Sequence, residues 1–108
     1  KLTMSENIAD LGGITLAIDS YDRALGGKRA PIVGGISGDQ RVFLGWALAF
    51  REKIRDQALR EQIATDEHAP GAYRINMPIR NVSTWYDAYR VSPRDRWYLT
   101  PAKRVTIW

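Results

Sequence analysis

A chain of 108 residues with 44% hydrophobic and 26% charged residues is ordinary for one small globular domain. Its 16 Lys and Arg against 12 Asp and Glu give a formal charge of +4, and no basic block, RNA-binding aromatic motif or zinc-finger spacing accompanies it, so we expect no nucleic-acid partner. The absence of cysteine excludes disulfides and thiolate metal sites.

The first predicted element is a helix from about residue 5 to residue 21. Its apolar side chains recur at steps of three and four, which marks one helical face: Ile8, Leu11, Ile14, Ile18 and Tyr21. Gly12 and Gly13 weaken this helix and favour a bend or a close backbone approach. A glycine-rich loop follows, from 26 to 35.

The second predicted helix begins with a capping box, in which Ser37 is the N-cap and Gln40 stands three residues on. One apolar stripe follows it: Phe43, Trp46, Ala47, Phe50 and Ile54. A shorter helix is predicted from about Asp56 to Thr65, where Leu59 and Ile63 are four residues apart.

The remaining part of the chain is less regular. Residues 73 to 78 are predicted to be extended after the break at Pro70 and Gly71. Ser83 is predicted to cap a last short helix. The predicted fold class is therefore mostly α, with three to four helices and short extended segments.

Aromatic residues gather in this last part of the chain. Six of the eleven lie from Trp85 onward. Two interpretations stay open: a small core absorbs them, or they form an exposed face that packs against more protein. The second interpretation predicts self-association of the chain.

Glu6 and Asp10 stand four apart and therefore project from one face of the first helix. Spacing alone favours a solvated acidic edge near a helix start, where the dipole favours negative charge. The alternative is a zinc ligand beside a carboxylate that holds a metal-bound histidine. Spacing does not choose between them.

His68, the sole histidine, lies in a polar loop, and Arg74 follows six residues later. Without context, each is most simply an exposed side chain. The functional alternatives are an imidazole that steadies a developing oxyanion and an arginine that grips a substrate carbonyl or carboxylate.

Taken together, these segments resemble the carboxyl-terminal part of the neprilysin family of zinc metallopeptidases. The matching blocks run in order along essentially the whole chain: Glu6-Asn7-Ile8-Ala9-Asp10-Leu11-Gly12-Gly13, Gly38-Asp39-Gln40, Phe43-Leu44, Trp46-Ala47, Thr65-Asp66-Glu67-His68-Ala69-Pro70-Gly71, Arg74-Ile75-Asn76, Trp85-Tyr86-Asp87-Ala88-Tyr89 and Trp108. The resemblance implies that residues 1–108 are the carboxyl-terminal portion of a thermolysin-like (gluzincin) catalytic domain.

The resemblance also implies a role for each matching residue. Glu6 matches the third zinc ligand, and Asp10 matches the residue that orients one of the zinc-bound histidines. His68 matches the imidazole that stabilises the tetrahedral intermediate. Arg74 matches the arginine that binds the substrate backbone beyond the scissile bond. Asp66, which is close to His68 in sequence, is predicted to orient it.

The chain departs from the family pattern at several positions. Ser5 stands where glycine is common. Ala49 and Phe50 stand where many members have Val-Trp, residues that help form the pocket for the side chain after the scissile bond, so the usual hydrophobic preference is in doubt. Val105 stands near the place of a cysteine in animal members, and the lack of any cysteine indicates a bacterial member.

The family's His-Glu-x-x-His motif and its Asn-Ala-Tyr segment do not occur in these 108 residues. Because a catalytic zinc needs about three protein ligands, we expect the isolated chain to be inactive and the upstream part of the same polypeptide to complete the site. The prediction is an exported or cell-envelope zinc endopeptidase that cuts small peptides. The alternative is a non-catalytic interaction or regulatory module derived from such a peptidase.

Overall fold

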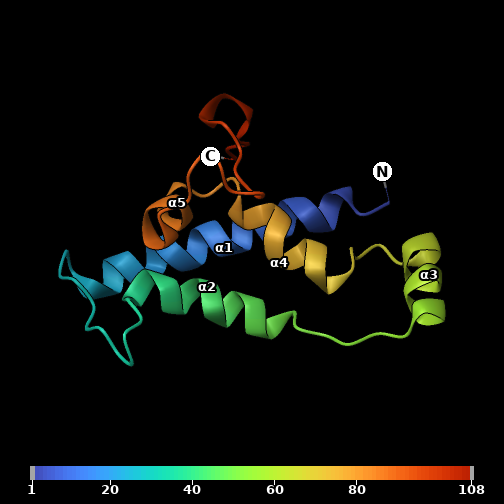
Figure 1. Ribbon diagram of the computed structural model, residues 1–108, viewed down its shortest axis with the longest axis horizontal. Coiled ribbons are helices and arrows are strands. Elements are labelled where there is room, and N and C mark those ends of the chain that lie inside the picture. Colours follow the sequence, from blue (N-terminus) through green and yellow to red (C-terminus); the bar gives the residue numbers. More distant parts are fainter. Residues whose placement is uncertain (1, 108) are drawn as a thin grey trace.

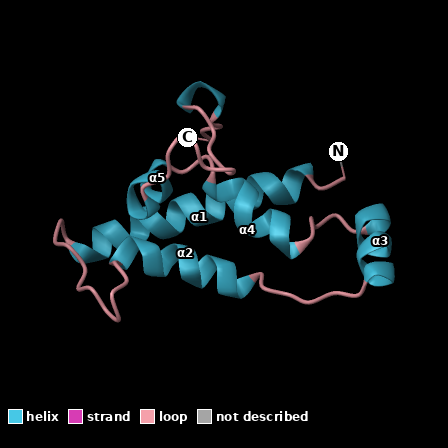
Figure 2. Cartoon of the chain, viewed as in Figure 1, coloured by secondary structure: helices cyan, strands magenta, loops and turns pink. Residues whose placement is uncertain are grey.

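The computed structural model describes residues 2–107, and Figures 1 and 2 show a helical chain. The described residues form five α-helices and one short 3-10 helix: α1 (Met4–Leu25), α2 (Gly38–Ala49), α3 (Asp56–Thr65), α4 (Gly71–Ile79), α5 (Ser83–Tyr89) and η1 (Pro101–Lys103). Within residues 2–107 the only β-type pairing is an isolated bridge between Val33 and Ile36. The predicted mostly α class is confirmed. The described residues form five α-helices where three to four were expected.

The long helix α1 is the centre of the fold. It packs against α4 and α2, while α2 also packs against α4 and α5, and Figure 1 shows α3 set apart at one end. The core lies along the predicted face of α1, and its buried members are Leu11, Ile14, Ile18, Phe43, Ile79 and Val82. Burying these side chains is the main stabilising term of the fold.

Helix α1 differs from its prediction in three respects. It continues to Leu25 and ends at Gly26, whose φ of 58° is the left-handed conformation that glycine adopts readily. It runs through Gly12 and Gly13 as one helix, and a Cβ added at Gly13 would meet no neighbouring heavy atom within 4 Å. The expected close approach is therefore wrong at Gly13. Ile8, at the start of the predicted stripe, is exposed.

Helix α2 begins with the predicted capping box. The Ser37 hydroxyl accepts a hydrogen bond from the Gln40 backbone N–H at 3.2 Å, and the Gln40 side chain accepts one from the Ser37 N–H at 2.9 Å. The helix ends at Ala49, so Ile54 at the end of the predicted stripe lies outside it. Helix α3 has the predicted bounds.

The extended segment predicted for residues 73 to 78 is wrong, because these residues lie in α4. The local pattern alternates apolar and polar side chains from Tyr73 to Met77, which is the period of a strand. Packing against α1 decides for helix, because it buries Pro78 and Ile79 at the end of α4. Tertiary contacts therefore override the local pattern.

The predicted cap of α5 is also wrong. Val82 is the N-cap, and Ser83 is the first helical residue. The aromatic cluster nearby is largely absorbed by packing. Tyr86 is buried, and its ring and that of Tyr98 meet edge to face with centroids 5.7 Å apart. Its hydroxyl donates a hydrogen bond to the Arg80 carbonyl at 2.7 Å. Trp108 lies outside the described residues.

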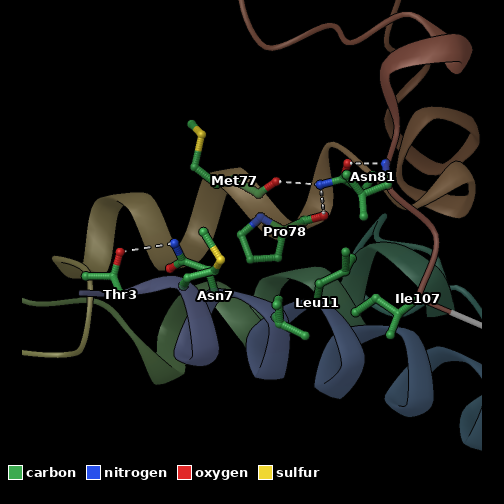
Figure 3. Close-up of a pocket in the computed structure, with 10 residues that line it drawn as sticks. Thr3, Asn7, Leu11, Met77, Pro78, Asn81 and Ile107 are labelled. Carbon is green, nitrogen blue, oxygen red and sulfur yellow. Dashed lines mark hydrogen bonds between the residues drawn. The ribbon is translucent and has the colours of Figure 1, made fainter. Parts of the chain in front are cut away.

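The last segment of the described chain returns across α1 and α4, and Figure 3 shows the residue that holds it. The Asn81 amide nitrogen donates to the carbonyls of Met77 and Pro78, while its oxygen accepts from the Val105 N–H at 2.8 Å. A cavity of about 320 Å³ lies between this segment, α1 and α4, and Leu11 and Ile107 line it. Among the described helices, none is both long and apolar enough to cross a membrane.

Candidate active site

The structure brings the four predicted polar site residues into two contacting pairs. Glu6 and Asp10 lie one turn apart on α1. The loop after α3 carries His68, whose Nε2 lies 3.1 Å from Glu6 Oε2. Helix α4 carries Arg74, whose guanidinium reaches Asp10. Because Asp10 is only 5% exposed, the interpretation of a solvated acidic edge is wrong for this residue.

Asp10 and Arg74 form a two-point ion pair. Arg74 Nε donates to Asp10 Oδ2 at 2.8 Å, and Nη2 donates to Oδ1 at 2.7 Å. The planar guanidinium matches a carboxylate in this geometry, and the hydrogen bond raises the pKa of Arg74 above its usual value. Among residues 2–107, Nη1 donates to no protein acceptor. One edge of the guanidinium is therefore left for a ligand.

His68 lies between two carboxylates. Asp66 Oδ1 accepts a hydrogen bond from the His68 backbone N–H at 2.8 Å and lies 3.0 Å from the ring Nδ1. The backbone hydrogen bond is the main cause that lowers the pKa of Asp66, and the contact with the ring adds to it. Both ring nitrogens can donate to these carboxylates only when the imidazole carries two protons.

The residues expected to contact substrate line one cavity of about 180 Å³. Ala49, Phe50, His68 and Arg74 all contribute to its wall. Ala49 is the last residue of α2 and Phe50 is its C-cap, so the end of this helix places both beside α4. The Arg74 guanidinium carbon lies 4.3 Å from the centre of the Phe50 ring, a cation–π arrangement.

Three further residues shape this region, and no sequence motif singled out their contacts. Glu52 Oε1 accepts from the Gly71 N–H at 2.6 Å, at the first turn of α4. Gln62 lines the cavity with a buried side-chain oxygen that has no hydrogen-bond partner among residues 2–107. Trp46 donates from its indole nitrogen to the Arg74 carbonyl at 3.1 Å. The Glu52 and Trp46 contacts join segments that are 19 and 28 residues apart in sequence, a distance at which periodicity gives no signal.

Gly71 has a steric reason to be glycine. A Cβ at this position would lie 2.3 Å from the Phe50 carbonyl oxygen and 2.9 Å from Glu52 Oε1. The segment after α2 therefore approaches the start of α4 closely. In the sequence, Gly71 indicated only a break after Pro70.

The residues present fit one part of a zinc site. The Glu6 side chain is 32% exposed and offers a carboxylate oxygen, which zinc accepts as a ligand. Within residues 2–107, no group of three or more His, Cys, Asp or Glu side chains is arranged to hold a metal ion. The described chain thus offers one ligand of suitable chemistry rather than a complete site.

Comparison with known proteins gives the class first. The structure of the zinc metalloprotease Zmp1 of Mycobacterium tuberculosis in complex with inhibitor is 42% identical to this chain, with a TM-score of 0.97, over 99% of this chain and 16% of that one. The open state of the same protein gives a TM-score of 0.96 at 42% identity. The fold is therefore that of one part of a zinc metalloprotease.

The family follows from the sequence comparison. The family model described as "Peptidase family M13" matches residues 1–105, and the chain therefore belongs to peptidase family M13, the neprilysin family. Neutral endopeptidases of Lactobacillus helveticus and Lactococcus lactis subsp. cremoris are 32% and 34% identical over the whole of this chain, which covers 15% and 16% of their lengths. The chain thus spans about one sixth of these relatives. The predicted resemblance is confirmed.

Proposed function

We propose that this chain is the carboxyl-terminal part of the catalytic domain of a zinc metalloendopeptidase that hydrolyses small peptides. The observation that carries the proposal is the convergence of two acid–base pairs, Glu6 with His68 and Asp10 with Arg74, beside a cavity. Membership of peptidase family M13 supports peptide-bond hydrolysis as the reaction. The bacterial relatives are named neutral endopeptidases, which supports cleavage within peptides.

In this proposal Glu6 is the zinc ligand that this chain supplies, and histidines from the upstream part of the same polypeptide complete the site. A bound zinc supplies Lewis-acid activation of water and of the substrate carbonyl. Asp10 fixes Arg74 and keeps lone pairs free, because a carboxylate has about four acceptor sites. Those lone pairs are suited to orient a metal-bound histidine.

His68 is proposed to stabilise the oxyanion. When Glu6 serves as a metal ligand, Nε2 of His68 is released to donate to the substrate carbonyl oxygen as negative charge develops on it. Asp66 holds the opposite ring nitrogen and thereby sets the direction in which Nε2 points. The ring therefore needs no reorganisation when the charge forms.

Arg74 is proposed to bind the substrate backbone through Nη1, the edge that Asp10 leaves free. Ala49 and Phe50 form the adjacent wall and contact the substrate side chain after the scissile bond. Ala49 is small, so this wall leaves more room than a bulkier residue would. Export of the whole polypeptide to the cell envelope or beyond belongs to the same proposal.

The test is steady-state kinetics of the whole polypeptide with zinc and a short fluorogenic peptide. We expect His68→Ala to lower kcat by about 10²–10³. Glu67→Ala is the matched control, because Glu67 is the exposed neighbour of His68, and it should leave kcat unchanged. Peptide binding without hydrolysis by the unmutated polypeptide would instead favour the non-catalytic module.

A further inference from the structure

Helix α4, which carries Arg74, contains a proline within its length. In an α-helix the N–H of residue 78 would donate to the carbonyl of residue 74. Pro78 has no N–H, and its ring also crowds that carbonyl. Figure 3 shows the Pro78 ring within α4 directed toward α1, and Pro78 is buried. The Arg74 carbonyl therefore lacks its ordinary helical donor.

Trp46 of α2 supplies a donor to that carbonyl. Its indole Nε1–H donates to Arg74 O at 3.1 Å across a sequence separation of 28 residues. A tryptophan N–H that leaves water needs an acceptor, and a carbonyl without its helical partner needs a donor. The indole N–H of Trp46 and the Arg74 carbonyl, which Pro78 leaves without its helical donor, thus satisfy each other.

The same tryptophan also supports the Arg74 side chain. The rings of Trp46 and Phe50 meet edge to face, with centroids 4.7 Å apart at 61°. Phe50 in turn lies beneath the guanidinium of Arg74 at 4.3 Å. Helix α2 and its C-cap therefore contact Arg74 twice: Trp46 contacts the Arg74 backbone, and Phe50 contacts the Arg74 side chain. Asp10 of α1 fixes the guanidinium from another direction.

We propose that Trp46 and Pro78 form a positioning device that sets where Arg74 presents its free edge to substrate. This rests on the proposed function, in which Arg74 binds the substrate backbone. Pro78 removes the helical hydrogen bond, and Trp46 replaces it with a bond to another helix. The position of Arg74 is thereby tied to α2, which also provides the cavity wall at Ala49 and Phe50. Trp46 acts through Arg74 and is a positioning residue.

The first test is Trp46→Phe in the whole polypeptide, because phenylalanine keeps an aromatic ring and removes the indole N–H. Arg74 would bind ground state and transition state alike, so KM should rise while kcat stays nearly constant. We expect KM to rise by about three- to tenfold, the effect of one lost hydrogen bond. Trp85→Phe is the control, because Trp85 packs against the same core and meets Tyr86 edge to face. An unchanged KM in Trp46→Phe would overturn the proposal.

The second test is a double-variant cycle with Pro78→Ala. Alanine restores a backbone N–H that can donate to the Arg74 carbonyl, so the indole bond becomes dispensable. Trp46→Phe should then change KM by less than about twofold relative to Pro78→Ala alone. If Trp46 served only to fill space, its substitution would have the same effect in both backgrounds, and that result would refute the device.

A third readout does not depend on peptidase activity. Hydrogen exchange of the Trp46 indole N–H, observed by nuclear magnetic resonance with nitrogen-15-labelled tryptophan and assigned from the signal missing in Trp46→Phe, should be slow in the unmutated polypeptide. It should become faster in Pro78→Ala, where the new backbone N–H competes for the carbonyl. Unchanged exchange in Pro78→Ala would overturn the device even in an active enzyme. A polypeptide that cleaves no peptide but shows the predicted change would refute the proposed function and leave the device standing.

Discussion

At the scale of single residues, the ion pair between Asp10 and Arg74 is the main polar interaction of the interior. Its two hydrogen bonds are 2.7 and 2.8 Å long, and the side chains are 6% and 19% exposed. A charge left without its partner in such a place costs more than the pair contributes when intact. Removing either partner should therefore weaken the packing of α1 against α4.

The first prediction concerns Asp10→Asn, which keeps the size of the side chain and removes its charge. We expect the free energy of unfolding to fall by about 3 kcal/mol, because Arg74 is left half-paired in a poorly solvated place. Urea unfolding of the chain followed by circular dichroism measures this. Asp19→Asn, at an exposed site on the same helix, should change stability little. Equal effects of the two substitutions would mean that the pair has no special role.

The second prediction concerns pH. The pKa of Asp66 lies below its ordinary value of 3.8, mainly because its carboxylate accepts from the His68 backbone N–H. Because the pKa of Asp66 is lower in the folded state, its ionised carboxylate stabilises the fold. This stabilisation is fully present above pH 3.8 and is lost as the pH falls through the lower folded-state pKa. The His68 amide resonance should therefore shift with a midpoint below 3.8, and Asp66→Asn should abolish the transition. A midpoint at or above 3.8 would contradict the geometry.

At the scale of elements, the helices differ in how their ends are satisfied. Both hydrogen bonds of a capping box form at the start of α2, whereas α5 begins without a side-chain cap. The two serines at these places are therefore not equivalent. Ser37 is the N-cap of α2, and Ser83 is the first residue inside α5.

The third prediction compares these two serines. Ser37→Ala should lower the free energy of unfolding by about 1 kcal/mol, because an orphan N–H at the start of α2 loses its acceptor. Ser83→Ala should be close to neutral, because its hydroxyl caps nothing. Urea unfolding of the two variants under the same conditions measures the difference. A larger loss of stability for Ser83→Ala than for Ser37→Ala would show that Ser83, rather than Val82, caps the start of α5.

At the scale of the whole molecule, much apolar surface is left uncovered. Leu44 and Leu48, one turn apart on α2, are 40% and 63% exposed, and Ile63 on α3 is 61% exposed. Among the described aromatic residues from Trp85 onward, Tyr86 is buried, three are half-buried and Tyr89 is exposed. Exposed apolar side chains one turn apart on a helix, as Leu44 and Leu48 are, are typical of surfaces that contact other protein. The chain spans about one sixth of its relatives, which is in keeping with such surfaces being covered in a longer protein.

The fourth prediction is that the isolated chain self-associates through this aliphatic surface rather than through its aromatic residues. Sedimentation velocity at several concentrations should show a concentration-dependent increase in mass. Leu44→Lys with Leu48→Lys should weaken the association, because burying two ammonium groups is unfavourable. Ile32→Lys, in the exposed loop before α2, is the control for added charge. A chain that stays monomeric at all concentrations refutes the prediction.

Local signals in the sequence determined most of the helices. The three- and four-residue spacing along α1, the Ser37–Gln40 box of α2 and the bounds of α3 are all properties of neighbouring residues. The family was also readable from the sequence, because its motifs around Glu6 and His68 keep their order and spacing. The resemblance assigned Glu6, Asp10, His68 and Arg74 to one site, but it did not predict that they pair as Glu6 with His68 and Asp10 with Arg74.

Only the tertiary structure decided the rest. Residues 73 to 78 alternate like a strand but fold as α4, because packing against α1 buries the end of that helix. Asp10 and Arg74 are 64 residues apart, and nothing local to either predicts a bidentate pair. The indole N–H of Trp46 donates to the Arg74 carbonyl from another helix, and Pro78, four residues after Arg74, has no N–H to donate to it. Periodicity and capping report contacts within a few residues, whereas these contacts exist only once α1, α2 and α4 are packed together.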